Sequence, residues 1–143
     1  MTDLSTARLQ AVRVHMHREV TQDWDGVIAT FAQPRYELWG SGAVIDGEAA
    51  VRAYLLAAHT AFPDQSGEVI ALACGGDSVL AEFWLTGTHL GPLQVGDRLV
   101  PATGKTFRVR LVATFEFAPG GDKIVCERVY SDADAIPRAL GLV

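Results

Sequence analysis

The sequence has few cysteines, few lysines and no long apolar run, and each shortage argues against a class of protein. The two cysteines, Cys74 and Cys126, lack metal-site spacing and a companion pair, so neither a disulfide scaffold nor a zinc site is expected. Lysine occurs only at Lys105 and Lys123, and a net charge of −5 argues against a nucleic-acid partner. No apolar stretch approaches the ~20 residues of a membrane helix, and the first residues do not resemble a signal peptide. A cytoplasmic protein with no membrane partner is therefore expected.

Several catalytic motifs are also missing. The chain has no Gly-rich phosphate loop, no Gly-x-Ser-x-Gly elbow and no His-Glu-x-x-His pair. His15 and His17 are two residues apart on a predicted helix, so they do not share a face and make a poor metal pair. These absences predict a site without cofactor or metal. The length of the chain predicts a single domain spanning residues 1–143.

The first third of the chain has helical periodicity. An apolar stripe runs through Leu9, Val12, Met16 and Val20. Asp23 is a suitable N-cap for a short second helix from Trp24, which ends at Pro34. A third helix is predicted from Asp46 to Pro63.

From Gln65 onward the apolar period changes from 3.6 to 2, which is typical of strands. Strands are predicted over 68–74, 78–89, 106–118 and 123–131, with a short one at 36–39, a long loop at 90–104 and a final helix at about 134–140. Helices that precede an antiparallel meander predict an α+β fold. The N-terminal helices would pack in the concave face of a curved, cone-shaped antiparallel sheet.

The alternation in the long strands predicts which face is buried. Residues 107, 109, 111, 113, 115 and 117 are all apolar, so this face is expected to line the interior. The opposite face carries Trp84, Arg108, Arg110 and several carboxylates. A sheet face rich in Trp and Arg predicts a homodimer formed through the outer side of the sheet.

The same alternation, carried through the last strand, predicts a polar group inside an apolar pocket. Arg128, Tyr130 and Asp132 would point inward, with His89 nearby. Asp132 in an apolar cavity would have a raised pKa and act as base. Tyr130 or His89 would donate to a developing enolate oxygen, and Arg128 would orient the ligand. The remaining expected lining is aromatic or apolar: Trp24, Tyr36, Trp39, Tyr54, Phe83, Phe107, Leu111 and Phe115.

Each polar candidate also has a structural interpretation. Asp132 could cap the last helix, and Arg128 could neutralise a carboxylate at the sheet rim. Tyr130 could be a core aromatic with a solvated hydroxyl, and His89 could satisfy loop carbonyls. Trp24, Trp39 and Tyr54 could belong to the core rather than to a pocket.

Several segments together resemble the SnoaL-like polyketide cyclase (ester cyclase) family of the nuclear-transport-factor-2-like superfamily. They are 62–64 (Phe-Pro-Asp), 86–91 (Thr-Gly-Thr-His-Leu-Gly), 101–105 (Pro-Ala-Thr-Gly-Lys), 124–132 and 140–141 (Leu-Gly). The resemblance implies a cone-shaped α+β fold and an aldol ring closure without cofactor, with an Asp as general acid/base. Asp132 best matches that aspartate, and His89 matches the family's Gly-Thr-His motif. Many relatives carry Trp where this chain has Arg128, which implies a smaller or anionic ligand.

Three functions follow from these residues. The first is a cofactor-free enzyme that acts on a small hydrophobic carbonyl compound by proton abstraction. The second is a non-catalytic module that binds a small hydrophobic ligand in the same pocket. The third is an epoxide hydrolase, for which Arg128 and Asp132 would supply two parts of an Asp–Arg–Asp set and a second inward Asp is missing.

Overall fold

The computed structural model describes residues 2–143 and contains four helices: α1 (Asp3–Val20), α2 (Trp24–Ala29), α3 (Glu48–Ala61) and α4 (Ala135–Ala139). Thr2 caps α1 through the Ser5 amide, and Asp23 caps α2 through the Gly26 amide, as predicted for the second helix. The third helix begins at Glu48, two residues later than predicted, because Asp46 ends a strand and Gly47 is the N-cap.

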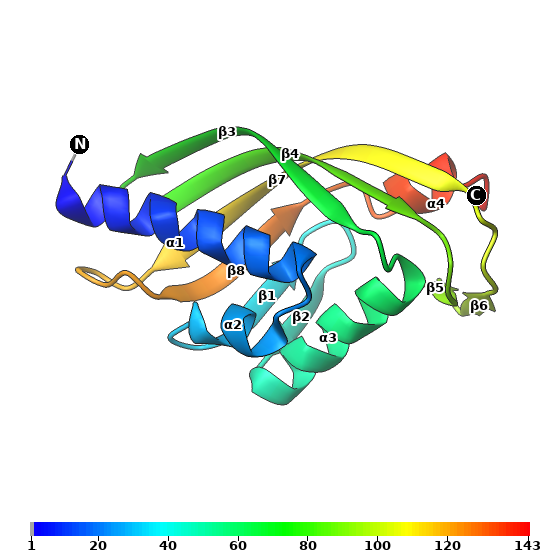
Figure 1. The fold of residues 1–143 in the computed structure, drawn as a ribbon, viewed down its shortest axis with the longest axis horizontal. Helices are drawn as coiled ribbons and strands as arrows, with labels where there is room; N and C mark the ends of the chain where they lie inside the picture. The colour runs from blue at the N-terminus through cyan, green and yellow to red at the C-terminus, as the bar shows by residue number, and fades with distance from the viewer. Residues whose placement is uncertain (1) are drawn as a thin grey trace.

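A six-stranded sheet arches over the first three helices, with α4 beside its far end (Figure 1). Its order is β2-β1-β8-β7-β4-β3, and all neighbours are antiparallel except β1 and β8. The strand bounds are β1 (Arg35–Leu38), β2 (Ala43–Asp46), β3 (Ser66–Gly75), β4 (Ser78–Thr88), β7 (Thr106–Phe117) and β8 (Ile124–Tyr130). The predicted α+β class, with helices in the concave face of a curved sheet, is confirmed.

The sequence analysis missed three short strands. Strand β2 was expected to be a turn followed by the third helix. Two more strands, β5 (Leu93–Val95) and β6 (Arg98–Val100), form a small hairpin within the predicted long loop. Strands of three or four residues contain too few alternations to show a period.

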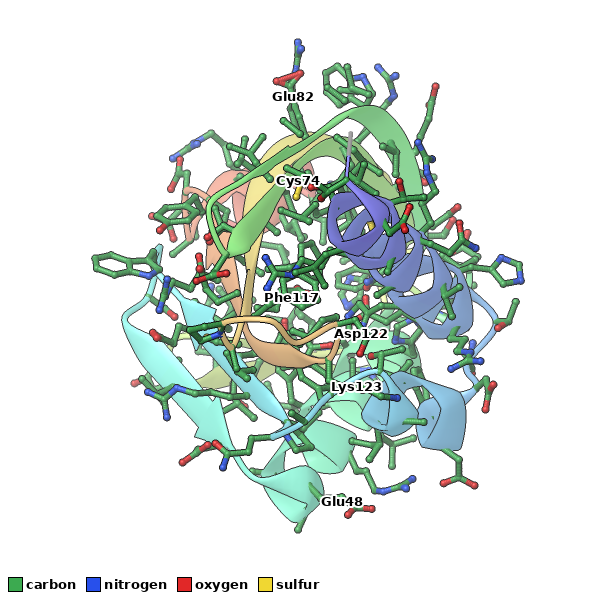
Figure 2. The ribbon with its side chains drawn as sticks, turned by 90° about the vertical axis from the view of Figure 1, so that its left-hand side faces the viewer. Glu48, Cys74, Glu82, Phe117, Asp122 and Lys123 are labelled. Atoms are coloured by element: carbon green, nitrogen blue, oxygen red, sulfur yellow. The ribbon has the colours of Figure 1, made fainter. Side chains whose placement is uncertain are left out.

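The row of apolar residues from Phe107 to Phe117 faces the helices and is buried, as predicted. Figure 2 shows Phe117 inside the molecule and Glu82 pointing away from the opposite face of the sheet. The core is therefore apolar where β7 faces the helices.

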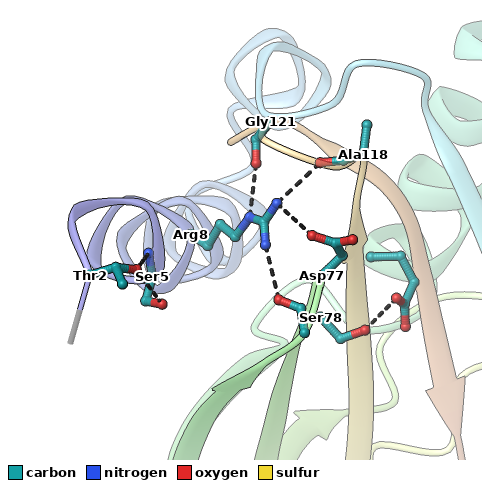
Figure 3. A network of polar contacts seen from close by, with 9 residues as sticks. Thr2, Ser5, Arg8, Asp77, Ser78, Ala118 and Gly121 are labelled. Atoms are coloured by element: carbon teal, nitrogen blue, oxygen red, sulfur yellow. Dashed lines mark hydrogen bonds and ion pairs between the residues drawn. The ribbon is translucent and has the colours of Figure 1, made fainter.

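Arg8 of α1 contacts two turns of the sheet (Figure 3). Its guanidinium donates to the backbone oxygens of Gly76, Ala118 and Gly121 at 2.8–3.1 Å and pairs with Asp77 at 3.1 Å. These acceptors belong to the β3–β4 and β7–β8 turns. One buried side chain therefore joins α1 to both hairpins.

The predicted inward direction of Arg128 and Tyr130 is wrong, because β8 contains a β-bulge. Glu116 pairs with Cys126 but Phe117 pairs with Ile124, so the intervening Val125 has no partner on β7. An extra residue reverses the alternation of the strand beyond it. Glu127 consequently points into the core, while the side chains of Arg128 and Tyr130 lie on the outer face.

Candidate active site

A cluster of four polar side chains lies in the core, directly beneath the sheet. His15 and Glu19 are one helical turn apart on α1, Tyr36 comes from β1 and Glu127 from β8. His15 is fully buried, and only 8% of the Glu127 side chain is exposed. The His15 Nε2 atom lies 3.0 Å from a carboxylate oxygen of each glutamate and 3.2 Å from the Tyr36 hydroxyl. One ring nitrogen thus meets two carboxylates.

The hydrogen bonds fix which atoms carry protons. The Thr30 hydroxyl donates to the backbone oxygen of Val27, so its oxygen accepts from His15 Nδ1–H at 2.8 Å. The Tyr36 hydroxyl donates to Glu19. The Nε2 atom of His15 is then the proton donor to the two carboxylates, which requires an imidazolium ring.

The environment separates the pKa values of the two glutamates. Burial raises the pKa of Glu127, the charge of Glu19 raises it further, and His15 only partly opposes them, which gives a value of about 7. Burial also raises the pKa of Glu19, but its contacts with His15 outweigh that effect and the net shift is downward. Burial lowers the pKa of His15, yet the two carboxylates bring it to about 10. At neutral pH the cluster holds an imidazolium, an ionised Glu19 and a Glu127 that can take or release a proton.

Glu127 and Glu19 also line a small cavity, which we name the inner cavity. It contains about 40 Å³ of free space, enough for one or two waters. Phe83, Leu85 and Phe115 form its apolar wall, and the other lining residues are Met16, Val20, His59, Gln65, Ser66 and Gly67. A carboxyl group with a pKa near 7 at the wall of a largely apolar cavity is suited to general acid/base chemistry.

The cluster also has the residue types of a metal site. Ligand-type atoms of His15, Glu19 and Glu127 all lie within 4.8 Å of one another. The histidine is already hydrogen-bonded directly to each carboxylate at 3.0 Å, and these contacts have the geometry of shared protons. We therefore interpret the cluster as a proton-sharing group.

The cluster makes stability depend on pH in a defined direction. The folded-state pKa of Glu127, about 7, exceeds its ordinary value of 4.5, and that of His15, about 10, exceeds 6.5. Between pH 4.5 and 10 the folded state therefore binds more protons, so stability falls as pH rises. We expect the free energy of unfolding to be highest near pH 5 and to fall by about 4–5 kcal/mol by pH 8. Urea unfolding across this range measures it.

The Glu127→Gln variant is the control for that measurement, because it removes the group that titrates near pH 7. Its unfolding free energy should change less between pH 5 and 7 than that of the wild type. A wild-type stability that increases from pH 5 to pH 8 would contradict the assignment of the protons.

The structure places Asp132 elsewhere, at the edge of a second cavity. We name this the mouth chamber; it has a volume of about 240 Å³ and lies between the sheet, α3 and α4. Asp132 is exposed, accepts from the Asp134 amide at 2.9 Å and pairs with Arg138 at 2.8 Å. The Arg138 contact holds the pKa of Asp132 below its usual range, opposite to the predicted rise. The N-cap of α4 is Asp134 and no side chain caps this helix, so Asp132 forms a turn just before α4 and does not cap it.

The other predicted polar residues are also dispersed. Arg128 pairs with Glu37 at 3.3 Å and Glu116 at 3.1 Å on the outer face, which matches the interpretation of charge neutralisation. Tyr130 is 42% exposed and stacks on Trp39. His89 is buried against Phe62, and its Nδ1 atom contacts Thr103, so it anchors the following loop. The structure therefore does not bring the predicted trio and His89 together.

The expected pocket lining is partly correct in position. Phe83 and Phe115 line the inner cavity, and Tyr54 and Leu111 line the mouth chamber. Tyr36 belongs to the polar cluster. The other three lie elsewhere: Trp24 packs on His59, Phe107 packs on Phe62, and Trp39 is 61% exposed on the outer side of β1.

The sequence analysis missed His15, Glu19 and Glu127 as site residues. A helical pattern could have indicated two of them, because Val12, His15 and Glu19 are spaced by three and four residues and share one face of α1. Glu127 could not be found in this way, because strict alternation assigns it to the outer face.

Comparison with known families supplies the identity of the fold. The model of the SnoaL-like domain family matches residues 12–127, which is most of the chain and extends into β8 as far as Glu127. The protein belongs to the SnoaL-like domain family. The resemblance found in the sequence is thereby confirmed, and the family indicates a cyclase- or isomerase-like enzyme. No curated protein matches the chain.

Solved structures agree with the family's fold. A provisionally named SnoaL-like polyketide cyclase from Jannaschia sp. CCS1 superposes with a TM-score of 0.85 at 23% identity, over 100% of this chain and 97% of that chain. A similarly named polyketide cyclase from Xanthomonas campestris gives 0.82 at 19% identity, over 96% and 99%. A ketosteroid isomerase-like protein from Catenulispora acidiphila gives 0.74 at 15%, over 93% of each chain. Within residues 2–143, none of the helices is both long and apolar enough to cross a membrane.

Proposed function

We propose that this SnoaL-like protein is a cofactor-free enzyme that moves a proton on a small hydrophobic carbonyl compound, with Glu127 as general acid/base. The geometry of the cluster supports this proposal. Glu19 and Glu127 both contact the buried imidazolium of His15. Glu127 lies at the wall of the inner cavity, and its pKa is raised to about 7. Two carboxyl groups whose pKa values are pushed apart are typical of acid/base sites.

In the proposed step, the ionised Glu127 takes a proton from the carbon next to the carbonyl. The electrons of the broken C–H bond form a C=C bond, and the negative charge moves to the carbonyl oxygen. If the enolate is conjugated with a C=C bond, protonated Glu127 returns the proton at the far carbon, which gives an isomer. Alternatively, the enolate carbon attacks a second carbonyl carbon in the same molecule: a C–C bond forms, the first C=O bond is restored, and protonated Glu127 gives its proton to the new alkoxide oxygen. His15 remains an imidazolium that offsets the charges of both glutamates.

The enolate oxygen needs hydrogen-bond donors, and three side chains of the inner cavity are candidates. Gln65 has an amide and Ser66 a hydroxyl at the cavity wall. His59 contacts the backbone oxygen of Leu55 through Nδ1, at 3.1 Å, which fixes its ring beside the cavity. A donor placed where charge develops contributes to the rate.

The experiment is hydrogen–deuterium exchange on 2-tetralone, a small hydrophobic ketone with acidic protons next to its carbonyl. NMR in deuterated buffer follows the loss of these protons. We expect the protein to accelerate exchange above the buffer rate, with an acid limb near pH 7 that reports Glu127. Saturable 2-tetralone binding without exchange would instead support the non-catalytic binding module. Exchange that is equally fast in Glu127→Gln would assign the activity to another group.

The epoxide hydrolase hypothesis has no support from this site. It required Arg128 beside inward aspartates, whereas Arg128 lies on the outer face with Glu37 and Glu116.

The predicted homodimer through the outer sheet face remains a proposal, and the exposed residues there support it. Leu80 and Ile70 are about 40% exposed, and Trp84 stacks under the guanidinium of Arg108 at 3.8 Å. We expect light scattering to give twice the chain mass of 15.4 kDa, and Leu80→Glu to reduce it toward one chain. Leu99→Glu, at an exposed leucine of β6, is the control. A monomeric wild type would contradict the dimer.

A further inference from the structure

A groove runs along the surface from solvent to the inner cavity. We name it the α1–β3 groove; Arg13, Met16, His17 and Val20 of α1 and Ser66, Gly67 and Val69 of β3 line it. Four of these residues, Met16, Val20, Ser66 and Gly67, also line the inner cavity. The groove is therefore continuous with the site of Glu127.

The sizes of the two spaces determine how a substrate can lie. The inner cavity, at about 40 Å³, admits little more than a carbonyl group and its neighbouring carbon, whereas the groove offers about 350 Å³. The body of a substrate that reaches Glu127 must then lie in the groove. Gly67 leaves the groove floor open, since an added Cβ there would only touch Met16 and Phe83 at 3.7 and 3.9 Å.

The groove has an unpaired positive charge at its outer end. Within residues 2–143, Arg13 is the one arginine whose side chain makes neither a hydrogen bond nor an ion pair. It is exposed, and His17, also exposed, lies one turn further along the same face of α1. None of the groove's lining residues has a carboxylate. This local charge is opposite to the protein's net charge of −5.

We infer that the substrate is amphipathic and carries an anionic group, a carboxylate or a similar anion, that binds Arg13 while its carbonyl end reaches Glu127. The inference rests on the proposed function for the position of the carbonyl. Arg13 and Glu19 are six residues apart on α1, which is roughly 9 Å along the helix axis. An apolar segment of about that length would separate the anion from the reacting carbonyl. The guanidinium suits a carboxylate because it can donate two parallel hydrogen bonds.

A matched pair of fluorescent probes tests this recognition without turnover. The anionic probe is 8-anilinonaphthalene-1-sulfonate, and the neutral probe is N-phenyl-1-naphthylamine, which has the same rings without the sulfonate. We expect Arg13→Gln to weaken binding of the anionic probe about fivefold and to leave the neutral probe within twofold. Arg98→Gln, which removes an equal charge from the exposed β6, should change neither affinity.

A second variant shows whether the probes occupy the groove at all. Gly67→Leu fills the groove floor and should weaken both probes at least tenfold, with the fold checked by circular dichroism. The inference is overturned if Gly67→Leu leaves both affinities unchanged, or if Arg13→Gln weakens the two probes equally or neither. Glu127→Gln separates this outcome from failure of the proposed function, because it should lower the exchange rate on 2-tetralone by about 10³-fold while leaving the Arg13 effect on the anionic probe in place.

Discussion

Replacement of Glu127 by glutamine is expected to lower the enzymatic exchange rate on 2-tetralone by about 10³-fold, the usual contribution of a general base. Glutamine has nearly the same shape and keeps an oxygen that can accept from His15 Nε2, so the cluster's packing is preserved. The glutamine side chain differs in that it cannot take a proton from the substrate. The measurement is the exchange rate per enzyme across pH 5–9, which should also lose its limb near pH 7.

The matched control is Asp132→Asn. Asp132 is the aspartate that the family resemblance favours as the base, and it remains a sequence-based prediction. The structure gives it contacts with the Asp134 amide and Arg138 at the surface, so we expect the asparagine variant to keep its exchange rate within about threefold. If Asp132→Asn loses the activity and Glu127→Gln retains it, the base is Asp132 and the proposed role of Glu127 is wrong.

Replacement of Arg8 by methionine is expected to destabilise the fold by about 3–5 kcal/mol, the range for breaking a buried charged contact. Only 3% of the Arg8 side chain is exposed, and its guanidinium serves three backbone oxygens and Asp77. Methionine would fill part of the volume over Phe117 but would leave those oxygens without donors. Urea unfolding monitored by circular dichroism gives the change in free energy.

Two further variants define the origin of that loss. Arg8→Lys keeps the charge but loses the fork of donors, so an intermediate loss is expected. Arg98→Met changes an exposed arginine and should stay within about 0.5 kcal/mol of the wild type. A stability of Arg8→Met equal to that of Arg98→Met would show that the three carbonyl contacts are dispensable.

The sequence predicts the architecture well because the apolar patterns are long. The strand from Thr106 to Phe117 has six inward residues in strict alternation, which identifies its buried face. The turns at 75–77 and 119–122 contain glycines that mark the hairpins. The spacing of apolar residues along the sequence indicates which face of an element is buried. Burial of apolar surface is the dominant favourable contribution to folding.

The candidate site is less predictable because it depends on one irregular residue. Val125 is unpaired in the β7–β8 ladder, and nothing in the pattern around it distinguishes a bulge from regular strand. Without the bulge, Arg128 and Tyr130 face inward and Glu127 faces outward; with it, the assignment reverses. His15 and Glu19 were overlooked for a related reason, since polar residues on a helix are ordinarily assigned to solvent.

The contacts that complete the site have a consequence for the order of folding. Arg8 bonds to Gly121 and His15 bonds to Glu127, so each contact spans more than a hundred residues (sequence separations of 113 and 112). Synthesis proceeds at about 5–20 residues per second, so Gly121 and Glu127 are added several seconds or more after α1. In that interval the imidazole of His15 has no acceptor from β8, and the guanidinium of Arg8 has none from the β7–β8 turn. Assembly of the polar cluster and docking of the first helix should thus be a single late event.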